Sequence, residues 1–147
     1  MSSADRHHEA ILDHYRRPHG RGFLAEPDGQ ATRTNALCGE TMHVEIMMDE
    51  DRVHDIRFEC DACSVARASA SMMTDIVRGR SRAEIEQFIT RLKQFVTANP
   101  AAPDDSELGP LVALGIVRRT PARVTCALLA WETLSEALAR TLLLELS

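Results

Sequence analysis

Two stretches in which every second residue is apolar flank the segment DEDR at residues 49–52 and predict a β-hairpin. The apolar positions are Val44, Ile46 and Met48 before the segment and Ile56, Phe58 and Cys60 after it. His43, Glu45, Arg57 and Glu59 lie between them, so we expect one face of the hairpin to be buried and the other to be solvated. A hairpin cannot stand alone in water, so other segments must cover its apolar face.

Helical patterns on both sides of the hairpin can supply this cover. We expect helices at residues 4–17 (with Ser3 as N-cap), from about 64 to a C-terminal Gly79, from the capping box Ser81–Glu84 onward, around 108–114, and at 121–145. A short strand at 31–35 is a further candidate. The sequence therefore predicts an α+β fold, a small antiparallel β-sheet with helices packed on one face, and its 147 residues suit a single domain, 1–147.

Composition excludes several classes of partner. The net charge of −5 and the aromatic content of 4% give neither a basic surface nor the stacking side chains that bind nucleic acid. No window approaches the ~18 apolar residues that cross a bilayer, and the first 20 residues lack the apolar core of a secretory signal. We therefore expect a cytoplasmic protein without a membrane partner, in a compartment where thiols stay reduced.

Four cysteines could be buried packing residues, a disulfide set or metal ligands. The reducing compartment argues against disulfides. Cys38 is followed directly by Gly39 and Glu40, whereas Cys63 and Cys126 lie near the N-terminal ends of two expected helices. The positive end of a helix dipole stabilises the thiolate, which is the form that binds a metal or attacks sulfur.

Three thiolates and one carboxylate make a candidate tetrahedral zinc set of Cys38, Glu40, Cys63 and Cys126, although sulfur-rich ligands also suit an iron–sulfur cluster. Arg123, one helical turn before Cys126, could offset the excess negative charge. Spacing alone leaves a shared site and separate buried thiols equally open. Cys60 forms a C-x-x-C pair with Cys63, but it shares the apolar hairpin face and is expected to be core packing.

The whole chain resembles the IscU/SufU/NifU N-terminal family of iron–sulfur cluster assembly proteins. The matching stretches are ILDHYRRP at 11–18, NALCGE at 35–40, the segment from Phe58 that continues as CSVARASASMM to residue 73, and PARVTCALLAWETL at 121–134. Thr125 stands where the IscU branch has histidine, and the long interval from Cys63 to Cys126 is similar to the insertion of the SufU branch. The chain departs from the family at Glu40, where aspartate is usual, and at Cys60 and Ala62, where glycines are usual.

The resemblance to the SufU branch implies a zinc-dependent sulfurtransferase with Cys38, Glu40, Cys63 and Cys126 as zinc ligands. It implies a SufS-like cysteine desulfurase as the partner, whose histidine displaces Cys38 from zinc so that Cys38 accepts persulfide sulfur, and further cluster assembly proteins downstream. Cys63 and Cys126, on helices, are the expected anchors. The alternative is a non-enzymatic scaffold that builds and delivers a [2Fe–2S] cluster, and a third interpretation is a structural zinc protein.

The histidines near the N-terminus, His7, His8, His14 and His19, look like a cluster in the sequence. His7, His14 and His19 do not share one helical face well, so we expect them, with His8, on a solvated helix and turn.

Overall fold

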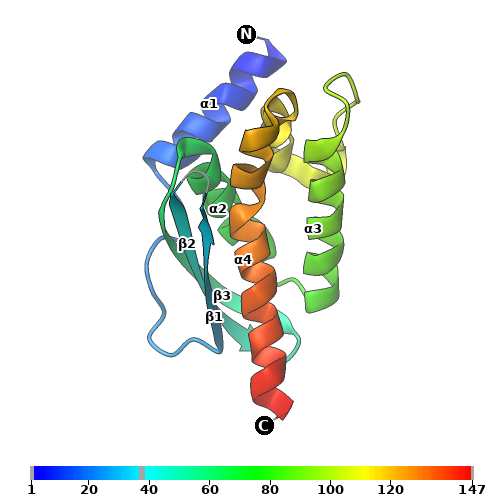
Figure 1. The fold of residues 1–147 in the computed structure, drawn as a ribbon. Helices are drawn as coiled ribbons and strands as arrows, with labels where there is room; N and C mark the ends of the chain where they lie inside the picture. Colours follow the sequence, from blue (N-terminus) through cyan, green and yellow to red (C-terminus); the bar gives the residue numbers. More distant parts are fainter. Residues whose placement is uncertain (1, 37–38, 147) are drawn as a thin grey trace.

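The computed structural model describes residues 2–36 and 39–146 and confirms an antiparallel sheet covered by helices on one face (Figure 1). The strand order is β1-β2-β3. Along the chain the elements are α1 (Ser3–Arg16), β1 (Gly29–Asn35), β2 (Glu40–Asp49), β3 (Arg52–Asp61), α2 (Ser64–Val77), α3 (Arg82–Thr97), the 3₁₀ segment η1 (Ser106–Arg119) and α4 (Pro121–Leu146).

The predicted hairpin is formed by β2 and β3. Val44 pairs with Phe58 and Ile46 with Ile56, and all four side chains are fully buried on the helix-covered face. A register shift between Met47 and Met48 interrupts the ladder near the turn. The short strand expected at 31–35 is confirmed as β1, which begins two residues earlier. It pairs with β2 from Gly29↔Ile46 to Asn35↔Glu40, so the connection between β1 and β2 lies at the same end of the sheet as the end of β3.

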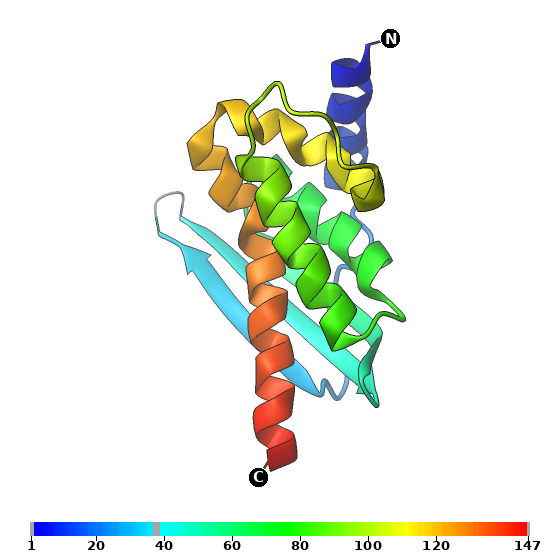
Figure 2. The ribbon, with the colours of Figure 1, turned by 90° about the vertical axis from the view of Figure 1, so that its right-hand side faces the viewer.

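Helices α2 and α4 cover the sheet, and α3 lies outside them (Figures 1 and 2). The small side chains of α2 allow it to lie close to α4, as buried Ser69 shows: its hydroxyl donates to the carbonyl of Ala127 at 2.7 Å and accepts from the indole N–H of Trp131 at 3.1 Å. Trp131 is fully buried in the core. This packing fixes α4 across the sheet and places its first turns near the β1–β2 end.

The outer face of the sheet differs from expectation because it is not fully solvated. Residues 20–22 hydrogen-bond to Phe58 along the edge of β3, and the chain then crosses the outer face before it enters β1 (Figure 1). Glu45 is consequently 6% exposed, with its carboxylate accepting from the backbone N–H of Leu24 at 2.7 Å and from His43 at 2.8 Å.

Two helical segments also differ from the predictions. The N-cap of α1 is Ser2 and not Ser3, because the Ser2 hydroxyl accepts from the N–H of Asp5 while the Asp5 carboxylate accepts from the N–H of Ser2. The short helix expected around 108–114 is the longer 3₁₀ segment η1, kinked at Gly109, where φ is +55°.

In the described part of the chain, no helix combines the length and apolar character that a membrane crossing requires.

Candidate metal centre

Glu40 is the centre of a buried polar cluster at the β1–β2 end of the sheet. Glu40 is the first residue of β2 and is only 3% exposed. Because a buried carboxylate is costly without hydrogen bonds, it requires partners. Oε2 accepts from the backbone N–H of Cys63 at 2.8 Å, and Oε1 accepts from Asn35 Nδ2 at 3.2 Å and from Cys126 Sγ at 3.1 Å. One carboxylate thereby joins β1, β2, the start of α2 and α4.

The two cysteines come from helix ends that the core holds in place. Cys63 is the N-cap of α2, and its side chain makes no capping hydrogen bond to that helix. Cys126 lies in the second turn of α4 and is 4% exposed. One ligand atom each from Glu40, Cys63 and Cys126 lie within 4.8 Å of one another. The structure therefore brings together three of the four residues predicted as ligands.

Cys38, the fourth predicted ligand, lies outside the described residues. Its neighbour Gly39 has a φ of +64°, which favours glycine, and lines a cavity of about 360 Å³ together with the three clustered residues. Arg123 also lines this cavity, as the prediction of a nearby positive charge requires. The cavity leaves room beside the cluster for a further ligand.

The electrostatics of the cluster suit a cation. Burial opposes ionisation of Glu40, but hydrogen bonds from Cys63, Cys126 and Asn35 outweigh it and hold the pKa of this carboxyl below its usual value. Burial raises the pKa of the Cys126 thiol, and the hydrogen bond to Glu40 and the neighbouring Cys63 raise it further. The Cys126 thiol thus keeps its proton and donates a hydrogen bond to the Glu40 carboxylate, and a bound cation would replace that proton because metals deprotonate coordinating thiols.

The donor set fits zinc. Zinc takes thiolate sulfur at about 2.3 Å and carboxylate oxygen at about 2.0–2.2 Å in four-coordinate sites. Two sulfurs and one carboxylate oxygen already converge, and the N–H of Cys63 holds the second carboxylate oxygen in the way that outer hydrogen bonds orient ligands. Sulfur-rich ligands of this kind also suit an iron–sulfur cluster.

Cys60 does not join this cluster. It is half-buried on β3 and packs against the core, where burial raises the pKa of its thiol despite the nearby Arg67 guanidinium. We expect Cys60→Ala to keep one zinc per chain and to lower the free energy of unfolding by at most about 1 kcal/mol, since only a partly exposed sulfur is removed. Metal analysis and thermal unfolding measure both, and loss of zinc in this variant would show that the C-x-x-C pair binds metal.

Two features escaped the sequence reasoning. Asn35 supports Glu40, and the available signal was the candidate strand at 31–35, which pairs Asn35 with the start of β2. His14 and His19, expected on a solvated helix and turn, instead converge with Asp75 of α2, and one ligand atom from each lies within 4.8 Å of the others. Their places agree with the expected helix and turn, since His14 lies on α1 and exposed His19 follows it, but their convergence was not predicted.

Comparison with known proteins gives a consistent result. The family model described as the NifU-like N-terminal domain matches residues 6–109. A protein of Streptococcus pyogenes named iron–sulfur cluster assembly scaffold protein IscU is 37% identical over 89% of this chain and 81% of its own length. A protein of Bacillus subtilis named zinc-dependent sulfurtransferase SufU is 34% identical over 90% of this chain and 88% of its own length.

Solved structures agree with these relatives. The N-terminal part of a NifU-like protein from Brucella abortus has a TM-score of 0.82 and 28% identity, covering 93% of this chain and 94% of its own. A putative iron–sulfur cluster assembly scaffold protein for the SUF system, from Fervidobacterium islandicum, has a TM-score of 0.81 and 25% identity, covering 93% and 99%. Both the arrangement of the elements and the sequence are therefore shared with proteins of this type.

Proposed function

This chain belongs to the NifU-like N-terminal domain family, and from that premise we propose that it is an iron–sulfur cluster assembly protein that accepts persulfide sulfur from a cysteine desulfurase while bound to zinc. The observation that carries the proposal is the convergence of Glu40, Cys63 and Cys126 beside a cavity that Gly39 also lines. Such a set offers metal-binding sulfur and oxygen at a position that a partner protein can reach.

The proposed zinc ligands are Cys38, Glu40, Cys63 and Cys126. Bound zinc would keep the ligand thiols deprotonated and would lower their nucleophilicity until a ligand is displaced. Cys63 and Cys126 suit the role of fixed ligands, because Cys63 is the N-cap of the packed helix α2 and Cys126 is buried on α4. Glu40 is equally fixed, through hydrogen bonds to Asn35 and to the N–H of Cys63.

Cys38 is the proposed sulfur acceptor. Its thiolate attacks the terminal sulfur of the desulfurase persulfide, the S–S bond of that persulfide breaks, and the partner's cysteine leaves as a thiolate. Cys38 then carries the persulfide sulfur, and the exchange needs no external oxidant or reductant. The Arg123 guanidinium, at the same cavity, would stabilise the anionic groups during this exchange.

A scaffold function is the second candidate. The 37% identity to the Streptococcus pyogenes protein named a scaffold favours it, and the same sulfur ligands suit a [2Fe–2S] cluster. In this alternative the chain is no enzyme but assembles the cluster and passes it to downstream assembly proteins. Thr125, where the IscU branch has histidine, supports the sulfurtransferase instead.

The test is metal analysis of anaerobically purified protein combined with a desulfurase assay. We expect about one zinc per chain and a faster release of alanine from cysteine when a SufS-like desulfurase is added to the zinc-loaded protein. The opposite result would be a purified protein that contains iron and acid-labile sulfide but no zinc, and that does not stimulate the desulfurase. That result would support the scaffold function and contradict the sulfurtransferase function.

A further inference from the structure

His14 and His19 come together with Asp75 at the junction of α1 and α2, where Asp75 lies near the C-terminal end of α2 and Cys63 of the candidate metal centre is the N-cap of the same helix. The two imidazole rings have centroids 4.8 Å apart, and His19 Nδ1 lies 2.6 Å from Asp75 Oδ2. His14 is half-buried, whereas the side chains of His19 and Asp75 are 54% and 44% exposed. The group is therefore well organised and still open to solvent.

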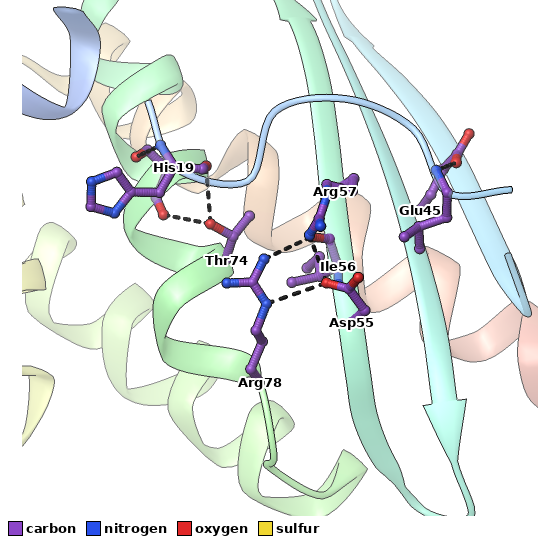
Figure 3. A network of polar contacts seen from close by, with 9 residues as sticks. His19, Glu45, Asp55, Ile56, Arg57, Thr74 and Arg78 are labelled. Atoms are coloured by element: carbon purple, nitrogen blue, oxygen red, sulfur yellow. Dashed lines mark hydrogen bonds and ion pairs between the residues drawn. The ribbon is translucent and has the colours of Figure 1, made fainter. Parts of the chain in front are cut away.

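Buried hydroxyl groups of α2 hold this arrangement. The Ser71 hydroxyl accepts from the backbone N–H of His19 at 2.7 Å and lies 2.7 Å from His14 Nδ1. The Thr74 hydroxyl donates to the carbonyl of His19 at 3.0 Å, while the His19 ring points away from the sheet (Figure 3). Gly20 makes this close approach possible, because a Cβ there would lie 2.5 Å from the Thr74 side chain and its φ is +76°.

The histidine rings have the properties of metal ligands. A coordinating imidazole binds through one nitrogen and hydrogen-bonds through the other, and the contact of His14 Nδ1 with the Ser71 hydroxyl can supply that hydrogen bond. Burial lowers the pKa of His14, and so does His19, whereas Asp75 and Asp13 oppose this shift. The Asp75 carboxylate supplies the negative charge.

We propose that His14, His19 and Asp75 form a second site, which takes a divalent transition-metal ion of the zinc class through two imidazole nitrogens and one carboxylate oxygen. One ligand atom from each residue lies within 4.8 Å of the others. Small rotations of the side chains would place each ligand atom about 2.0–2.2 Å from a metal ion between them. His14 and His19 also line a cavity of about 560 Å³, which leaves an open coordination position for water.

This site would differ from the candidate metal centre in chemistry and in role. It contains no sulfur, so it suits zinc, nickel or cobalt bound by nitrogen and oxygen. Its three ligands come from α1, from the segment after α1 and from α2. A bound ion would therefore fasten the first helix to α2, independently of whether the chain accepts sulfur.

The test is the number of zinc ions bound by the full chain after dialysis against buffered free zinc. We expect two per chain for the unaltered protein and for His8→Gln, a matched change of an exposed histidine on α1. His19→Gln and Asp75→Asn should each bind one, because their exposed positions tolerate the change while a ligand is lost. Cys63→Ser should lose the first ion and keep the second, which separates this proposal from the proposed function.

Imidazole NMR provides the second measurement. Addition of the second equivalent of zinc should shift the ring nitrogens of His14 and His19 and leave those of His43 and His54 unchanged. One zinc per chain in the unaltered protein, at free zinc up to the millimolar range, would overturn the proposal. Retention of the second ion in folded His19→Gln would do so as well.

Discussion

Replacing Cys38 with serine is expected to abolish sulfur uptake from a cysteine desulfurase and to return the desulfurase to its unstimulated rate. A serine hydroxyl is neither a comparable nucleophile at neutral pH nor able to hold a persulfide, so the S–S exchange has no acceptor. The variant should still hold zinc, because Glu40, Cys63 and Cys126 are positioned by the packed ends of β2, α2 and α4. Alanine release and mass spectrometry of the intact chain after brief incubation with desulfurase and cysteine measure both effects.

Cys60→Ser is the matched control for this experiment. It also removes one thiol, but Cys60 lies outside the Glu40–Cys63–Cys126 cluster, so stimulation and the mass increase of one sulfur should persist. Peptide mapping then locates the sulfur on Cys38. A persulfide found chiefly on Cys60, Cys63 or Cys126 would contradict the assignment of Cys38 as acceptor.

The hairpin was predictable because its signal is local. Alternation around residues 49–52 predicts both the pairing of β2 with β3 and the face that is buried. The exact register was not predictable, because Val44↔Phe58 depends on the register shift between Met47 and Met48. The burial of Glu45 on the opposite face was not predictable in this way. It depends on the chain before β1 crossing the sheet, and that segment has no periodicity that reports its path.

The metal centre shows a different limit. Spacing along the chain could not bring Cys63 and Cys126 together, because their distance depends on how α2 and α4 pack through contacts such as Ser69–Ala127. The resemblance to a known family supplied that information. His14 and His19 had no such guide: His19 lies beyond the end of α1, so helical geometry says nothing of its position, which hydrogen bonds to Ser71 and Thr74 determine.

Removal of zinc is expected to lower the melting temperature by about 10 °C or more. Zinc that binds only the folded chain stabilises it by about 4 kcal/mol at a free concentration 1,000 times the dissociation constant. Each kcal/mol corresponds to roughly 2–8 °C for domains of this general size. The effect is large here because the ligands join the β1–β2 end of the sheet to α2 and α4, elements that are far apart in sequence. Calorimetry before and after dialysis against a strong chelator measures it.

Cys63→Ser separates the loss of metal from the loss of packing. Its side chain is only partly buried and makes no capping hydrogen bond, so the metal-free variant should unfold near the temperature of the metal-free unaltered chain. With zinc at a low free concentration that leaves the His14–His19–Asp75 group unfilled, the variant should gain little, because one of its strongest ligands is missing. An equal rise in melting temperature on adding zinc to the variant and to the unaltered chain would mean that zinc stabilises the fold without Cys63. An unchanged melting temperature of the unaltered chain after complete chelation would contradict the coupling of metal binding to folding.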